Sequence, residues 1–162
     1  MDKFTLNKEN SLLLIIDIQE GLAPVVRNGD QVIKNTNILI SSAEKFNIPI
    51  VVTEQYPKGL GLTVPEINNR LADSLKVEKT QFSACMSELI EALDIKGKKK
   101  IIITGMETHI CVFQTVRDLI SLGYEVFVVS DGVSSRTKEN NDNGLKLMEN
   151  MGAVILIHYH CF

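Results

Sequence analysis

Residues 11–17 read Ser-Leu-Leu-Leu-Ile-Ile-Asp, an unbroken apolar run that ends in a carboxylate. A short run without polar alternation is typical of a strand that is buried on both faces of a parallel sheet. Similar runs occupy residues 48–53 and 100–104. Because parallel strands are covered by helices on both faces, we expect amphipathic helices between these runs.

The rest of the chain fits this expectation of alternating strands and helices. Further strands are predicted at residues 75–79, 124–129 and 153–157, and helices at residues 30–46, 64–71, 83–93, 108–122 and 137–151. A loop with proline and glycine breakers is expected at residues 54–63. The sequence therefore predicts one α/β domain over residues 1–162, a three-layer sandwich with a doubly wound, mostly parallel sheet.

Composition narrows the classes of function. The 162 residues are 44% hydrophobic and 23% charged with a net charge of −3, so no overall positive field favours nucleic acid or an anionic membrane. The basic cluster at 96–100 is interpreted as a solvated loop with strand-edge lysines. The early apolar run is far too short to span a membrane, and residues 1–10 do not resemble a secretory signal. We expect a small-molecule substrate, with no nucleic-acid or membrane partner.

The chain has three cysteines, Cys85, Cys111 and Cys161, without close C-x-x-C spacing. Three thiols cannot all pair within one chain, so free thiols in a reducing, cytoplasmic setting are expected. No metal or other cofactor is expected. A redox role is disfavoured because no cysteine that could act as a resolving thiol lies near Cys111 in the sequence.

Three reactive side chains fall at strand ends, where open parallel sheets bind their ligands. Asp17 closes the first strand, Lys79 closes another, and Cys111 lies in the first turn of a helix that follows a third. The helix N-terminus and the ammonium would favour a thiolate, while the carboxylate would accept the thiol proton. Backbone amides around Glu107 and Cys111 could stabilise an oxyanion.

Each of these residues also has a plainer interpretation. A strand-end aspartate often forms a turn, most lysines are solvated, and an isolated cysteine is more often a small buried hydrophobe. The chemical interpretation predicts instead that Cys111 reacts with iodoacetamide well below pH 8.5, and faster than Cys85 or Cys161.

Three segments together resemble the motifs of the isochorismatase-like cysteine hydrolases. They are residues 12–19 (LLLIIDIQ), 78–84 (EKTQFSA) and 104–112 (TGMETHICV), in the same order and spacing as in that family. The resemblance runs from residue 11 to residue 157 and implies a six-stranded sheet with an Asp17–Lys79–Cys111 triad. It also implies a cis peptide between Met106 and Glu107, which aims the Glu107 and Cys111 amides at the oxyanion.

Departures from the family pattern bear on the substrate. The loop at 53–61 has no histidine, whereas nicotinamidases of the family bind a metal there, and Glu54 alone cannot replace such a site. Cys111 argues against vinyl-ether hydrolysis, because isochorismatases proper lack that cysteine. The loop is most similar to the isochorismatase domain-containing subgroup, whose substrates are not settled.

The leading hypothesis is hydrolysis of a small amide or related C–N bond through a thioacyl enzyme. The alternative is a catalytically silent binding or scaffold protein.

Further residues are expected to line the pocket or support the fold. Gln19 and Phe82 are expected to line the substrate pocket, and His109 to take a surface or supporting role. His158 and His160 share one face of an extended segment but are not expected to form a metal site. Cys85 is expected to open a helix and join the core, and Cys161 to be an exposed thiol.

The last predicted strand is followed by only a few residues, so one face of the sheet is short of helical cover. Residues 155–162 are also rich in apolar and aromatic side chains. We therefore expect a homo-oligomer, a dimer or larger, whose interface covers the site or the last strand. The alternative is a C-terminal helix that is missing from this sequence.

Overall fold

The computed structural model describes all residues from Met1 to Phe162, and a six-stranded sheet runs through its centre. Every pair of neighbouring strands is parallel, in the order β3-β2-β1-β4-β5-β6. The strands are β1 (Ser11–Ile16), β2 (Ile50–Gln55), β3 (Leu75–Lys79), β4 (Lys100–Met106), β5 (Glu125–Ser134) and β6 (Val154–Leu156). The predicted α/β class is confirmed, and the sheet is wholly rather than mostly parallel.

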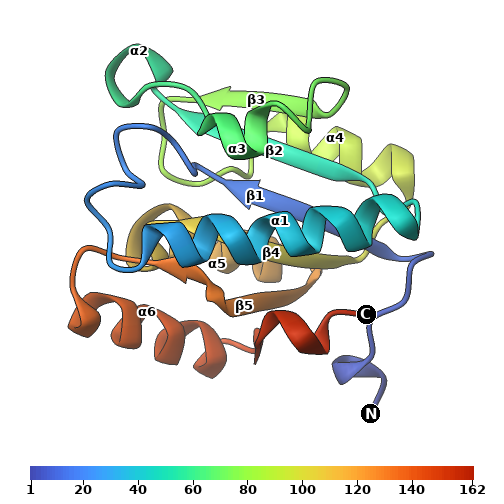
Figure 1. The fold of residues 1–162 in the computed structure, drawn as a ribbon. Helices are drawn as coiled ribbons and strands as arrows, with labels where there is room; N and C mark the ends of the chain where they lie inside the picture. The colour runs from blue at the N-terminus through green and yellow to red at the C-terminus, as the bar shows by residue number, and fades with distance from the viewer.

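Helices cover both faces of this sheet. They are η1 (Asp2–Phe4), α1 (Gly29–Lys45), α2 (Pro57–Leu60), α3 (Pro65–Asn68), α4 (Ser87–Lys96), the π-helix η2 (Thr108–Val112), α5 (Phe113–Ser121), α6 (Lys138–Asn150) and η3 (His158–His160). In Figure 1, α1 lies in front of the sheet, and α4 and α5 lie behind it.

Alternation along β1 divides the core into two clusters. Leu12, Leu14 and Ile16 point toward the side of α4, α5 and α6, whereas Leu13 and Ile15 join the side of α1 and α3. All six residues of β1 are buried because helices cover both of its faces. This burial places the C-terminal end of β1 in the middle of the molecule.

The helix that follows β3 begins later than expected. The sequence suggested residues 83–93, whereas α4 starts at Ser87 and runs to Lys96. The segment before it is held in a non-helical path, because the Lys79 ammonium binds the Phe82 carbonyl oxygen and the Ala84 amide donates to Thr115 Oγ1. Cys85 therefore precedes the helix instead of opening it, although it still packs against the core.

Strand β4 continues two residues beyond its predicted end, through Gly105 to Met106. Gly105 has a φ of 149°, and a Cβ atom there would collide with the carbonyl oxygen of Ile16. Glycine therefore allows the ends of β1 and β4 to approach closely. Beside it β5 is also longer than predicted, with a register shift between Ile103 and Gly105.

Two predictions about exposure were wrong. Cys161 is buried, because η3 turns the chain back over the α1 face of the sheet and places the thiol in that core. Lys100 is also buried, and its ammonium donates to the backbone oxygens of Asp2 and Thr5. Both side chains were expected to face water. Lys100 instead holds the N-terminal segment by hydrogen bonds, and Cys161 packs the C-terminal segment against the core.

The histidines near the C-terminal end do not share an extended face, because residues 158–160 form the turn η3. The Nδ1 atom of His158 lies 2.6 Å from Asp131 Oδ2, and the His158 amide donates to Asp131 Oδ1. His160 is exposed. Asp131 thus fixes η3 to β5.

Strand β6 is only half-buried along its length. A groove of about 400 Å³ runs beside it, lined by Lys3, Phe4, Glu149, Ala153, Val154, Ile155, Leu156 and His160. As the edge strand of the sheet, β6 packs Ile155 against one core cluster and Val154 and Leu156 against the other. No helix of the chain is both long and apolar enough to cross a membrane.

Candidate active site

Asp17 follows the last residue of β1 and is completely buried. Its backbone has a φ of 52°, a left-handed conformation that aspartate tolerates better than most residues. One carboxylate oxygen, Oδ1, accepts a 2.7 Å hydrogen bond from the Thr53 hydroxyl at the neighbouring position on β2. The chain turns sharply at this residue and holds its carboxylate at the edge of the sheet.

Lys79 is the last residue of β3, and its ammonium is completely buried. Its Nζ atom donates to Asp17 Oδ2 at 2.7 Å, to the Phe82 carbonyl oxygen at 2.8 Å and to Gln55 Oε1 at 2.9 Å. Burial of two charges is expensive unless they are paired and hydrogen-bonded, as these are. The two charges form a fully buried ion pair at the carboxyl ends of β1 and β3.

Cys111 is almost fully buried within the π-helix η2, directly after β4. Burial raises the pKa of its thiol to about 12; Asp17 raises it further, and Lys79 opposes the shift. The thiol is therefore close enough to both charged groups to interact with each. The shift is opposite to the effect expected from the helix N-terminus and the ammonium, because loss of water around the sulfur outweighs Lys79.

The segment that carries Cys111 is tied to the segment that follows Lys79. Thr115 Oγ1 donates to the Cys111 carbonyl oxygen at 2.7 Å and accepts from the Ala84 amide at 2.9 Å. The same hydroxyl thus joins the two parts of the site.

The peptide bond between Met106 and Glu107 is cis, as the resemblance implied. The Glu107 carboxylate accepts from the Arg136 amide at 3.1 Å and lies 3.6 Å from Arg136 Nε. Its backbone oxygen accepts from the amides of Ile110 and Val112. A role for the Glu107 and Cys111 amides in binding an oxyanion stays a prediction.

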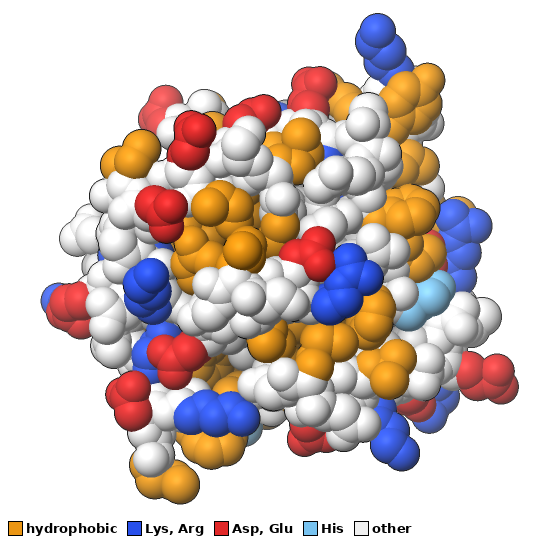
Figure 2. Space-filling model, turned by 180° about the vertical axis from the view of Figure 1, so that it is seen from behind, with side chains coloured by type: hydrophobic (Ala, Val, Ile, Leu, Met, Phe, Trp, Pro, Cys, Tyr) orange, Lys and Arg blue, Asp and Glu red, His pale blue; other side chains and the backbone are white.

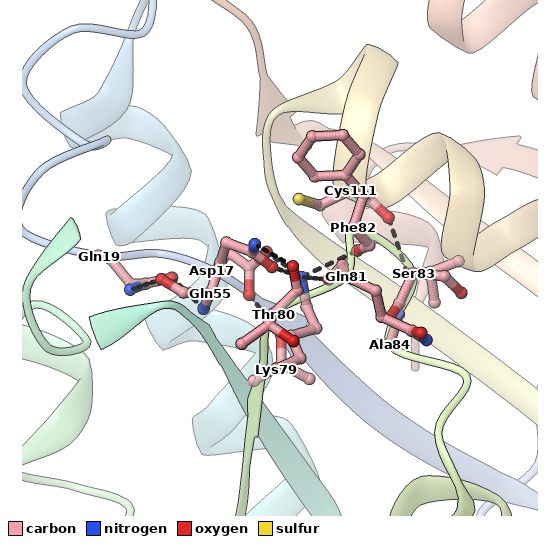
Figure 3. Close-up of polar contacts among 12 residues, drawn as sticks. Asp17, Gln19, Gln55, Lys79, Thr80, Gln81, Phe82, Ser83, Ala84 and Cys111 are labelled. Atoms are coloured by element: carbon pink, nitrogen blue, oxygen red, sulfur yellow. Dashed lines mark hydrogen bonds and ion pairs between the residues drawn. The ribbon is translucent and has the colours of Figure 1, made fainter. Parts of the chain in front are cut away.

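Gln19, expected to line the substrate pocket, is completely buried and hydrogen-bonded to the backbone beside the site. Its Nε2 donates to the backbone oxygens of Gln55 and Gly61, while its Oε1 accepts from the Gln55 amide. These contacts give it a structural position, and its role in substrate binding stays a prediction. Figure 3 shows Gln19 and Gln55 beside Asp17 and Lys79.

Phe82 contributes to the site through its backbone, whose oxygen accepts from Lys79. Its side chain is half-exposed and remains a candidate for substrate contact. A cavity of about 350 Å³ lies on the outer side of Lys79, lined by Tyr56, Pro57, Lys58, Glu78, Lys79, Thr80 and Met86.

His109 is partly buried, and its Nδ1 lies 2.8 Å from Ser135 Oγ. The neighbouring Thr108 hydroxyl donates to Asn141 Oδ1 on α6. These contacts fasten η2 to the loop after β5 and to α6. The supporting role predicted for His109 agrees with this position.

Glu54, the only carboxylate among residues 53–61, is buried near the end of β2 and is already hydrogen-bonded. Its Oε2 accepts from the Thr63 amide and hydroxyl at 2.6 and 2.8 Å and lies 3.6 Å from Lys76 Nζ. No group of three or more histidine, cysteine, aspartate or glutamate side chains is arranged to hold a metal ion.

The fold and site together define a doubly wound α/β protein with a buried Asp–Lys pair and a thiol beyond the carboxyl ends of its strands. The Isochorismatase domain model matches residues 11–158. The chain belongs to the isochorismatase family.

Curated relatives support this assignment. A secreted isochorismatase effector, Isc1, of Phytophthora sojae is 39% identical over 90% of this chain and 72% of its own. Isochorismatase domain-containing protein 1 of Danio rerio is 38% identical over 93% of this chain, which spans about half (53%) of the relative's length.

Solved structures share the fold closely. The MAR1 ribonuclease of Caenorhabditis elegans is 38% identical with a TM-score of 0.91, covering 95% of this chain and 80% of its own. The YcaC protein of Escherichia coli, described as an octameric hydrolase of unknown specificity, is 28% identical with a TM-score of 0.90. That match covers 96% of this chain and 79% of YcaC.

Proposed function

We propose that this isochorismatase-family protein is a cysteine hydrolase that cleaves a small amide or related C–N bond through a thioacyl enzyme. The observation that carries the proposal is the 2.7 Å contact between the buried Lys79 ammonium and Asp17, beside the thiol of Cys111. A nucleophile, a base and a fixed cation are the three groups that such a reaction requires.

Formation of the acyl enzyme begins with a neutral thiol, because the pKa of Cys111 is raised. Asp17 accepts the thiol proton as the sulfur forms a bond to the substrate carbonyl carbon, and the carbonyl oxygen becomes an oxyanion. Collapse of this intermediate breaks the C–N bond, and Asp17 returns the proton to the leaving nitrogen. Lys79 stays charged and stabilises the negative charge that passes between sulfur and carboxylate.

Hydrolysis of the acyl enzyme uses the same groups in the opposite direction. Asp17 takes a proton from water as the water oxygen attacks the thioester carbon. The C–S bond then breaks, a carboxylic acid leaves, and the proton on Asp17 returns to the sulfur of Cys111. Each turnover consumes one water and restores the resting thiol.

The test is a screen of small amides and N-carbamoyl compounds, with Cys111→Ala as the matched control. We expect turnover by the wild type, loss in the variant, and a transient adduct heavier by the acyl group on the Cys111 peptide. Turnover retained in Cys111→Ala would contradict the mechanism. Wild-type protein that binds such compounds without turnover or adduct would favour the alternative, a silent binding or scaffold protein.

A small molecule is the proposed substrate, although the related nematode protein is described as a ribonuclease. Affinity for RNA depends largely on lysine and arginine contacts to phosphates, whereas this chain has a net charge of −3. Cleavage of a labelled RNA that is lost in Cys111→Ala would replace this proposal.

We also propose that the protein forms a homo-oligomer. Figure 2 shows hydrophobic side chains grouped between charged ones on the face opposite α1. Half-buried apolar residues on this side include Met86, Ile90, Phe113 and Leu145. The half-buried β6 and the description of the E. coli relative as octameric point the same way. Light scattering that gives a mass of about 18 kDa at high concentration would exclude an oligomer.

A reducing, cytoplasmic setting is proposed from the three free cysteines. The Phytophthora sojae relative is described as secreted, so compartments differ among the proteins that this chain resembles. Fractionation of source cells with an antibody to the protein would test the setting.

A further inference from the structure

We propose that Gln55 is a positioning residue of this site, which holds the Lys79 ammonium against Asp17 through its side-chain oxygen. The inference rests on the proposed function, because it concerns the same three groups. Gln55 is the last residue of β2, next to β1 and β3 in the sheet.

The argument begins with the hydrogen-bond capacity of the ammonium. A charged lysine has three N–H donors and no acceptor. The three short contacts of Lys79 go to Asp17, Phe82 and Gln55, and a longer one of 3.4 Å reaches the Gln81 carbonyl oxygen. Because the Lys79 side chain is completely buried, bulk water cannot replace a lost acceptor. Gln55 therefore supplies one of three acceptors that the cation needs.

The orientation of the Gln55 side chain is also fixed. Its Nε2 donates to the Thr80 carbonyl oxygen at 3.3 Å, which leaves Oε1 facing Lys79 at 2.9 Å. The opposite orientation would place an NH₂ group against an ammonium and lose both contacts. The amide therefore has one favourable orientation.

Gln19 holds the backbone of Gln55 in turn. The two residues exchange hydrogen bonds of 2.7 and 2.9 Å, and Gln19 also donates to the Gly61 oxygen at 2.8 Å. A continuous series of contacts thus leads from the loop at Gly61 through both glutamines to Lys79 and Asp17. Figure 3 shows the part of this series from Gln19 to Asp17. Gln19 acts through Gln55, and Gln55 acts through the ammonium.

The consequence for chemistry concerns the negative charge that Cys111 develops as it reacts. An ammonium held at Asp17 stabilises that charge. If the Gln55 oxygen is removed, the buried ammonium loses an acceptor and is no longer held in place against Asp17. The reaction of Cys111 then slows, although Gln55 does not touch the sulfur or the substrate.

The experiment measures the rate at which acrylamide modifies Cys111 in the full chain, by mass spectrometry of the cysteine peptides. Cys85, outside the series of contacts, is the internal reference. Gln55→Met removes the oxygen at equal length, and exposed Gln31→Met is the matched control. We expect Gln55→Met to slow Cys111 about tenfold, the size typical of a lost charge-assisted hydrogen bond.

Combination with Lys79→Met separates positioning from packing, because Gln55 is proposed to act only through the ammonium. We expect Gln55→Met to slow Cys111 no further in the Lys79→Met background, and Gln31→Met to match the wild type. A wild-type rate in Gln55→Met would overturn the inference, and so would an equal slowing by Gln55→Met with and without Lys79. If Gln55→Met unfolds, shown by rapid labelling of the buried Cys161, Gln55→Asn takes its place, because its shorter side chain withdraws the oxygen.

Lys79→Met distinguishes failure of the inference from failure of the proposed function. If Lys79→Met slows Cys111 and Gln55→Met does not, only the role of Gln55 is wrong. If Lys79→Met leaves the Cys111 rate unchanged, the ammonium does not assist the sulfur, and both proposals fall.

Discussion

The hydroxyl of Thr53 donates a 2.7 Å hydrogen bond to Oδ1 of Asp17, with both side chains completely buried. This contact occupies the carboxylate oxygen that Lys79 leaves free. Replacement by valine keeps the shape of the side chain and removes the donor.

We expect Thr53→Val to lower the free energy of unfolding by about 1.5–3 kcal/mol, because a buried charged group loses a hydrogen bond. Thr36→Val on α1 is the matched control, since the Thr36 hydroxyl is buried without a partner. That substitution should be neutral or stabilising, because it removes a buried, unpaired polar group. Urea denaturation of both variants checks the prediction, and equal losses would contradict it.

We expect the buried Asp17 and Lys79 side chains to stabilise each other, and a double-mutant cycle measures this interaction. Lys79→Met and Asp17→Asn each leave one charge buried alone, and each should destabilise the fold by about 3–5 kcal/mol. The double variant removes both charges and should lose much less than the sum. Additive losses in urea denaturation would show that the two side chains do not stabilise each other.

The thiols predict how stability depends on pH. Burial raises the pKa of Cys111 and Cys161 to about 12 and that of Cys85 to about 11. A thiol whose pKa is raised in the folded state stabilises that state fully at any pH below its unfolded pKa of about 8.5. This stabilisation is lost as the pH rises through the folded-state pKa. The free energy of unfolding should therefore fall from about pH 8.5 toward pH 11–12.

Cys161→Ala tests that dependence. The variant should be less stable near neutral pH, because it leaves a small cavity, but its stability should fall less steeply at high pH. Parallel urea titrations from neutral to alkaline pH measure both effects. Curves of equal steepness would show that Cys161 does not ionise on unfolding.

The order in which the three cysteines should be alkylated is the reverse of the one predicted from the sequence. Cys85 is the most exposed of the three cysteines and has the smallest rise in pKa. Iodoacetamide at pH 8 should therefore label Cys85 before Cys111 and Cys161 in the folded protein. Peptide mapping over time shows the order. Labelling of Cys111 first would mean that Lys79 and Asp17 activate its sulfur more strongly than burial suppresses it.

Metal chelators should leave activity unchanged once a substrate is known. The only acidic side chain among residues 53–61 is that of Glu54, which already accepts from Thr63 and lies close to Lys76. Activity with and without EDTA or phenanthroline measures the effect. Loss that added zinc or iron reverses would reveal a metal site assembled in some other way.

Much of the fold could be predicted because local pattern and topology agree. The apolar runs at 11–17 and 100–104 became β1 and β4, and β3 has its predicted bounds. The carboxyl ends of parallel strands lie at one edge of the sheet. Asp17, Lys79 and the residues after β4 could therefore be predicted to lie close together. The sequence could not show which charge state burial would favour at the sulfur, because desolvation depends on the surrounding side chains.

The errors arose where long-range contacts override local signals. Helix α4 starts late because Lys79 and Thr115 hold the residues before it. Thr53 and Gln55 were missed, although they are polar residues at the end of an apolar run, as Asp17 is. Their roles depend on the pairing of β2 with β1, which a linear pattern does not specify. No local signal indicated that η3 would bury Cys161.

The three candidate groups come from segments that are far apart along the chain. Asp17 follows β1, Lys79 ends β3 and Cys111 follows β4, so the three meet only when these strands, with β2 between β1 and β3, have paired. A nascent or nicked chain that lacks one of these strands has no complete site. Under the proposed function, activity during refolding should therefore appear only once β1 to β4 have assembled.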